Sequence, residues 1–283
     1  MLKSKLMTTF QAVLYGVIEA IGEFLPIGAK ANHTLIPYLL GWPQPEGIFL
    51  GALSLGGLLA LLIYFRHDWA SMLSCFLQVI LFRKRPMTLD ERLPLFLGMT
   101  TFPLICASSY FHEQISALEW SPAFIAAVLA AFSLPLWFFD HMSRKNKGMF
   151  DWKWLDAFTV GLIQATALFP GWDHMSALLT GCFFLNYKRE PAVKYAYYAA
   201  IPILLAQTVS NLKNLSFQTS MAMPDVSWLS FAVALIVTFF VSLLVIGGFT
   251  KHIQSKGMGQ YVVYRFLLAA ITVGAFWMKN RAN

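Results

Sequence analysis

Six ionisable side chains of this 283-residue sequence gather at two places within otherwise apolar stretches: Glu19, Glu23, Lys30 and His33 at the first, Asp173 and His174 at the second. Glu19 and Glu23 are four residues apart, so a helix would present both carboxylates on one face. Such a pair suits a general base, a site for a divalent cation such as Mg²⁺ or Ca²⁺, or a proton carrier. A structural ion pair, for example between Glu23 and Lys30, is the alternative interpretation.

Lys30 and His174 are the cations nearest two Pro–Gly breaks, Pro26-Ile27-Gly28 and Pro170-Gly171. A phosphate group would be held by such cations together with the backbone N–H groups of glycine loops and half-helix N-termini. Gly28, Gly171 and Lys30 are therefore candidate phosphate-binding residues, and Asp173 beside them is a candidate substrate contact or, with the glutamates, part of a metal site. For His174, a neutral imidazole that hydrogen-bonds to Asp173 or to a carbonyl is the alternative.

The two breaks interrupt apolar regions at about 8–41 and 154–187. Proline removes a backbone donor and clashes with the preceding helical turn, and glycine weakens a helix. Broken backbone at membrane depth is tolerated only where protein or a water-filled cavity covers it. We therefore expect each region to form a re-entrant hairpin of two half-helices.

The rest of the chain predicts a single polytopic all-α membrane domain over 1–283. Hydrophobic residues make up 58% of the chain and charged residues 12%, about half the charged share of a soluble protein. Six apolar blocks approach the length of a transmembrane helix, about 20 residues; they are 48–65, 93–110, 121–140, 195–211, 228–248 and 260–278. The stretch 69–82 is expected to form an interfacial helix.

Basic residues predict the orientation. If the two hairpins enter from opposite sides, loops 66–92, 141–153, 187–194 and 249–259 share a face and carry fourteen Lys and Arg residues, against one in loops 111–120 and 212–227. The positive-inside rule makes the first face cytoplasmic and places both termini outside, although four basic residues near the termini run against it. No basic patch interleaved with aromatic residues indicates nucleic acid as a partner.

The two broken regions resemble each other. Gly16-Val-Ile-Glu-Ala leads to Phe24-Leu-Pro26, and Gly161-Leu-Ile-Gln-Ala leads to Leu168-Phe-Pro170, one residue shorter. Similar broken segments that enter from opposite faces are typical of inverted repeats, in which the site lies between the repeats near the middle of the membrane. We expect one repeat over about 8–140 and the other over about 154–278.

The first break, Glu19-Ala-Ile-Gly-Glu23-Phe-Leu-Pro-Ile, resembles the first signature of the bacterial undecaprenyl-diphosphate phosphatases (the UppP/BacA family), E-G-x-x-E-F-L-P-x-S-S-[ST]-G-H. Gln164-Ala-Thr-Ala-Leu-Phe-Pro170-Gly171 resembles the second, Q-x-x-A-[LI]-x-P-G-x-S-R-S-G. Further similarities, such as Tyr64-Phe-Arg66 and Tyr264-Arg265, extend over nearly the whole chain in the expected order.

The resemblance implies a protein of the bacterial inner membrane whose site opens to the outer face. There a carrier lipid of cell-wall synthesis, undecaprenyl diphosphate, loses one phosphate, often with a divalent cation. The glutamates would act as metal ligands or acid–base groups, the serines and the histidine of the first signature would act at the phosphate, and the arginine of the second would clamp it.

This sequence departs from the pattern at several of those positions. Gly28 and Ala29 replace the serine pair, and Lys30 takes the next hydroxyl position. Asn32 stands at the family histidine, with His33 one residue later. Asp173-His174-Met175-Ser176 replaces S-R-S-G. Arginine holds phosphate bidentately and is always charged, which histidine does not reproduce.

Three functions remain open at this point. The first is a divergent polyprenyl-diphosphate phosphatase with catalytic Glu19, Glu23, His33 and His174. Its phosphate-binding residues would also include Asn32 and Ser176, and its metal ligands would be the two glutamates. The second is a non-hydrolytic transporter or binding protein for polyprenyl phosphates, since transporters use inverted repeats with central breaks. The third is a hydrolase or phosphotransferase for another lipid headgroup.

Overall fold

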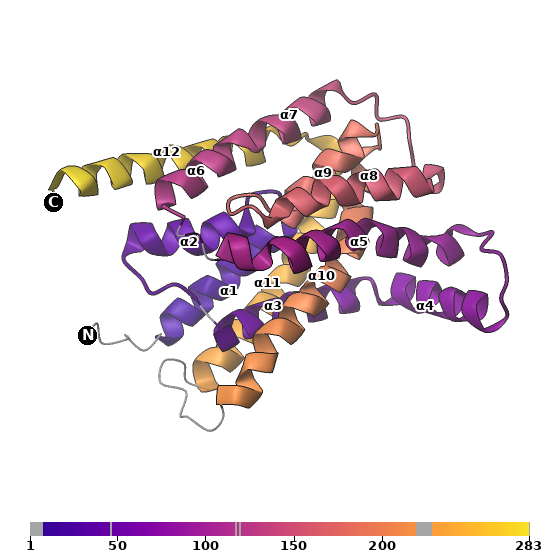
Figure 1. Cartoon of the computed structure of the whole chain (residues 1–283), viewed down its shortest axis with the longest axis horizontal. Helices are drawn as coiled ribbons and strands as arrows, with labels where there is room; N and C mark the ends of the chain where they lie inside the picture. Colours follow the sequence, from indigo (N-terminus) through magenta and orange to yellow (C-terminus); the bar gives the residue numbers. More distant parts are fainter. Residues whose placement is uncertain (1–7, 46, 117, 119, 219–227, 283) are drawn as a thin grey trace.

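The computed structural model describes residues 8–45, 47–116, 118, 120–218 and 228–282, which form an all-α fold (Figure 1). Five segments of this part are long and apolar enough to cross a membrane. They lie in α3 (Gly47–Tyr64), α5 (Leu89–Ser116), the pair α6 (Pro122–Ala131) and α7 (Ser133–Met142), α11 (Trp228–Ser255) and α12 (Gly259–Ala282). They correspond to five of the six predicted spans, so the chain is a polytopic membrane protein.

The sixth predicted span, 195–211, lies within α10 (Arg189–Gln218), a continuous helix of 30 residues. Its tyrosine, glutamine and asparagine side chains make it less apolar than the other five segments. The stretch expected to be interfacial falls in α4 (Arg66–Leu81), which packs beside α5 and leaves apolar side chains such as Leu73 and Leu81 exposed.

The two broken regions each form a pair of short helices, as the sequence predicts. The first consists of α1 (Thr9–Phe24) and α2 (Ala29–Leu40). The second consists of α8 (Trp154–Ala165), a short 3₁₀ turn (Thr166–Leu168) and α9 (His174–Phe184). All four α-helices are shorter than the roughly 20 residues that cross a bilayer. Within each pair the two helices contact each other, so each region is a helical hairpin.

Each hairpin packs its first helix along a spanning helix of the other half of the chain: α1 lies along α11, and α8 lies along α5. Both contacts are close at a glycine. A Cβ on Gly16 would lie 3.0 Å from Val237 Cγ1, and a Cβ on Gly161 would lie 2.5 Å from the Thr100 carbonyl oxygen. The Gly16 and Gly161 segments, which resemble each other in sequence, therefore make corresponding contacts.

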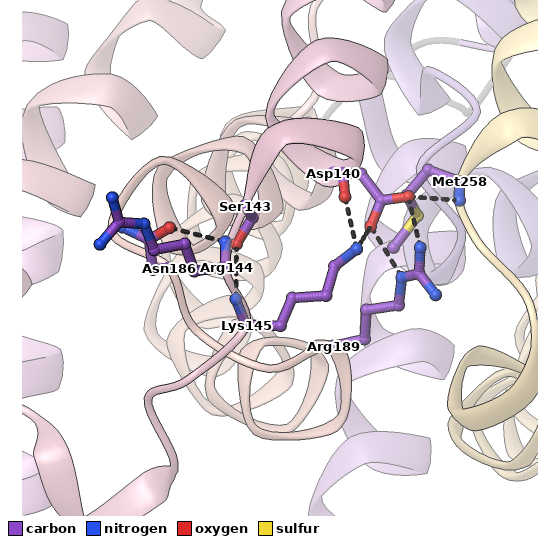
Figure 2. A network of polar contacts seen from close by, with 7 residues as sticks. All are labelled: Asp140, Ser143, Arg144, Lys145, Asn186, Arg189 and Met258. Atoms are coloured by element: carbon purple, nitrogen blue, oxygen red, sulfur yellow. Dashed lines mark hydrogen bonds and ion pairs between the residues drawn. The ribbon is translucent and has the colours of Figure 1, made fainter.

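Contacts between charged residues join the four loops that the sequence predicts on one face. Asp140, at the end of α7, accepts two hydrogen bonds from Arg189, at 2.7 and 3.0 Å, and one from the backbone N–H of Met258 at 3.0 Å (Figure 2). Lys145 donates to the Asp140 carbonyl at 2.5 Å. Lys194 pairs with Asp68 at 3.2 Å, which adds the loop that begins at residue 66. In Figure 1 the α4–α5 and α7–α8 connections lie at the end opposite to the start of α1 and the end of α12.

Candidate functional site

The two breaks meet inside the molecule. Gly28 and Gly171 both have left-handed backbone, with φ of +89° and +91°, a region that favours glycine. A Cβ on Gly28 would lie 3.8 Å from the Gly171 carbonyl oxygen, and Lys30 Nζ donates to the Ala167 carbonyl at 2.8 Å. Residues 137 positions apart in sequence are thus joined where the half-helices end.

A cavity of about 290 Å³ lies beside this junction, and all six ionisable side chains that the sequence singles out line it. The first hairpin contributes Glu19, Glu23, Lys30 and His33, and the second contributes Asp173 and His174. The remaining lining residues are Ala29, Thr34, Gln44, Pro45, Leu50, Ser54, Met175, Gln207 and Asn211. The cavity therefore combines three carboxylates, a lysine and two histidines with neutral polar groups from α3 and α10.

Glu19 and His33 form a direct contact between α1 and α2. His33 Nε2 lies against Glu19 Oε2, and both side chains are nearly buried. A carboxylate that contacts an imidazole fixes the orientation of the ring, as in acid–base pairs of hydrolases. His33, rather than the residue at the family histidine position, thus faces the cavity.

Asn32 lies outside the cavity. Its Oδ1 accepts a hydrogen bond of 2.7 Å from the Tyr264 hydroxyl, and its Nδ2 donates to the Ile27 carbonyl at 3.4 Å. With Tyr264 it lines a separate, mostly apolar pocket of about 350 Å³ between the first hairpin and α12. The structure therefore does not bring Asn32 together with the ionisable cluster.

The second hairpin presents its charged residues at the start of α9. Asp173 caps that helix, because its Oδ2 accepts from the backbone N–H of Ser176 at 2.9 Å. Ser176 is fully buried and its hydroxyl accepts from Arg265 Nη1 at 2.9 Å. Three of the predicted phosphate-binding residues, Ser176, Gly28 and Gly171, do not line the cavity themselves.

Sequence reasoning did not single out several residues at this site. Ser54, Gln207 and Asn211 line the cavity, but neutral polar residues in apolar helices carry no local signal of function. Arg265 had such a signal, since it is an ionisable residue within the apolar block 260–278.

The side chains that line the cavity decide whether a divalent cation could bind there. Among the described residues, no three His, Cys, Asp or Glu side chains are grouped closely enough to hold a metal ion by themselves. Glu19 and Glu23 nevertheless line the same cavity, and Mg²⁺ commonly binds to one or two carboxylates together with substrate phosphate oxygens and waters. The residues therefore fit a cation that arrives with a phosphorylated ligand.

Two helical hairpins whose breaks meet beside a cavity lined by charged side chains place this chain among polytopic membrane proteins with paired, broken helical hairpins. The chain belongs to the family described as bacitracin resistance protein BacA, whose model matches residues 12–271.

Similar proteins extend over the same length. A protein of Moorella thermoacetica named undecaprenyl-diphosphatase is 29% identical over 274 residues, which cover 97% of this chain and 100% of that protein. An undecaprenyl-diphosphatase of Idiomarina loihiensis is 33% identical over 265 residues, which cover 94% of this chain and 98% of that protein. The family expected from the sequence motifs is confirmed.

Proposed function

We propose that the cavity binds the diphosphate of a polyprenyl carrier lipid, such as undecaprenyl diphosphate, and hydrolyses it to the monophosphate and free phosphate. The observation that carries this proposal is that six ionisable side chains from two hairpins far apart in sequence line one cavity. Charged groups inside a membrane are costly, so such a concentration indicates function. The names of the relatives supply the substrate class.

The residues present are sufficient for attack by water. The Glu19–His33 pair accepts a proton from a water molecule that attacks the terminal phosphorus. The bond from that phosphorus to the bridging oxygen breaks, and the lipid monophosphate leaves. Lys30 and the first turn of α9 hold the phosphate oxygens. A divalent cation held by Glu19 and Glu23 would neutralise charge on those oxygens.

The rest of the molecule fits this proposal. The halves at about 8–140 and 154–278 act as inverted repeats, with the site where their breaks meet. The protein resides in the bacterial inner membrane, with the cavity open to the periplasmic side. The corresponding contacts of Gly16 and Gly161 support the repeat.

A non-hydrolytic carrier or binding protein for polyprenyl phosphates is the second candidate. Gly28 and Ala29 provide no hydroxyl at the motif positions. Ser54 and Thr34 do line the cavity, but their hydroxyls donate to carbonyls of their own helices, at 2.9 Å to Leu50 and 3.3 Å to Lys30. A carrier that only holds the phosphate needs no nucleophile, so this lining is compatible with a carrier as well as with attack by water.

Phosphate release from undecaprenyl diphosphate tests the first candidate. Purified protein with Mg²⁺ or Ca²⁺ should release phosphate, and the double variant Glu19→Gln/Glu23→Gln should lose at least about 10²-fold of that rate. Glu190→Gln, which changes an exposed glutamate, serves as the control. No release by folded protein that binds the lipid would exclude hydrolysis, and headgroup flipping in proteoliposomes would then test the carrier.

A further inference from the structure

Arg265 is a fully buried arginine in α12 that the proposed chemistry does not yet use. It lies within the apolar segment Gly259–Arg281, where a guanidinium is costly unless it has a charged partner or a role. No carboxylate among the described residues lies within ion-pair distance of it. Packing alone does not account for a charge at this depth.

All the contacts of the guanidinium that the structure records are with the second hairpin. Nη1 donates to the Ser176 hydroxyl at 2.9 Å, and the group lies over the Trp172 ring, 5.2 Å from its centroid. Trp172 is held in turn by a hydrogen bond of 2.9 Å from its Nε1 to the Thr166 hydroxyl. Arg265 is therefore fixed against the break that precedes α9.

Two of its nitrogens, Nε and Nη2, are buried and have no hydrogen-bond partner in the described part of the chain. These two atoms form one edge of the guanidinium, the edge that binds a carboxylate or phosphate bidentately. Buried polar atoms are nearly always paired in native structures. His174 Nδ1, at the same break, is also unpaired in the described part of the chain and can donate to such a ligand, whereas the unpaired Asp173 Oδ1 calls for a donor of its own. The unpaired Nε–Nη2 edge therefore points to an anionic ligand at this break.

The charge of the cavity supports the same conclusion. Three carboxylates face a single lysine there, a poor setting for an incoming diphosphate. Asp173 connects the cavity to Arg265, since it bonds the backbone of Ser176 and Ser176 bonds the guanidinium. A diphosphate at the second break therefore needs a further cation beside Lys30, and Arg265 lies behind Asp173 there.

We propose that Arg265 supplies the guanidinium that binds the lipid phosphate at the second break, the task for which position 174 here carries only an imidazole. The proposal rests on the proposed function for its ligand class, a polyprenyl phosphate or diphosphate. It assigns a direct part in phosphate binding to α12, which contributes no lining residue to the cavity of about 290 Å³, through the Nε–Nη2 edge behind Asp173.

The experiment measures binding of undecaprenyl diphosphate and undecaprenyl phosphate to full-length protein in nanodiscs. Arg265→Met should weaken binding by roughly 10–100-fold, the range for a lost charge-assisted hydrogen bond. Arg265→Lys should retain part of the affinity. Arg281→Gln is the matched control. Arg281 is on α12 and lies over a tryptophan ring, as Arg265 does, but it is exposed, so this variant should bind the lipids like the wild type.

The decisive variant is Arg265→Met/His174→Arg. If Arg265 binds phosphate, a guanidinium restored at position 174 should recover most of the lost affinity. Unchanged binding by Arg265→Met overturns the proposal. A loss of affinity that the double variant does not recover also overturns it, since that result indicates a structural role for Arg265. The thermal midpoint of each variant reports misfolding. If Arg265→Met does not fold, Arg265→Lys takes its place in the comparison with the wild type.

The proposed function and this inference fail separately. Wild-type protein that binds the diphosphate but releases no phosphate refutes hydrolysis and leaves the binding test of Arg265 intact. Wild-type protein that binds neither lipid refutes the ligand class, and with it this assignment.

Discussion

At the scale of single residues, the helical register of α2 decides which side chain reaches the cavity. The helix starts at Ala29, directly after Gly28, and each residue turns it by about 100°. Lys30 and His33, three residues apart, therefore share the cavity face, while Asn32 turns toward Tyr264. The family motif places its histidine at position 32, whereas the start of the helix turns position 33 toward the cavity.

His33→Asn should lower phosphate release by about 10²-fold or more, because it removes the imidazole that contacts Glu19. Asn32→Ala is the matched control on the same helix. It removes the hydrogen bond from Tyr264, costs about 1 kcal/mol of stability and should leave most of the release rate. The two rates, with thermal midpoints in detergent, check the prediction. Equal losses of activity in both variants would contradict the assignment of His33, rather than Asn32, to the cavity side of α2.

At the scale of helices, the sequence predicted both hairpins because proline and glycine interrupt apolar regions at matching positions. The ionisable cluster was predicted for a similar reason, since charges in apolar helices are conspicuous. The neutral lining residues Ser54, Gln207 and Asn211 could not be predicted, because their place depends on how α3 and α10 pack around the hairpins. Tertiary packing, which no local pattern encodes, supplies that part of the site.

The packing of α8 on α5 gives a prediction at this scale. Gly161→Ala places a methyl group 2.5 Å from the Thr100 carbonyl oxygen, so the helices must separate. The expected loss of stability is about 1–3 kcal/mol. Gly98→Ala on α5 is the control, because no atom lies within 4 Å of its added Cβ, and it should be neutral or slightly stabilising. Thermal unfolding in detergent compares the two, and a Gly161→Ala midpoint equal to that of Gly98→Ala would contradict this account of the contact.

At the scale of the whole molecule, charge and topology agree. The contacts of Asp140 with Arg189 and Met258, and of Asp68 with Lys194, join the four basic loops at one end. The sequence predicted that these loops share a face, because Lys and Arg concentrate in them. The specific partners could not be predicted, since each contact joins residues more than 45 positions apart.

The orientation of the molecule yields the last prediction. The positive-inside rule places the end with the basic loops in the cytoplasm, so the cavity mouth, which includes the exposed Gln44, should open to the periplasm. Gln44→Cys, in a background with Cys75→Ser and Cys106→Ser, should react with a membrane-impermeant thiol reagent that is added outside inner-membrane spheroplasts. Arg85→Cys, at the opposite end, should react only after permeabilisation. The reverse pattern would place the cavity on the cytoplasmic side, where a phosphatase for an outward-facing carrier lipid could not meet its substrate, and would favour the carrier function instead.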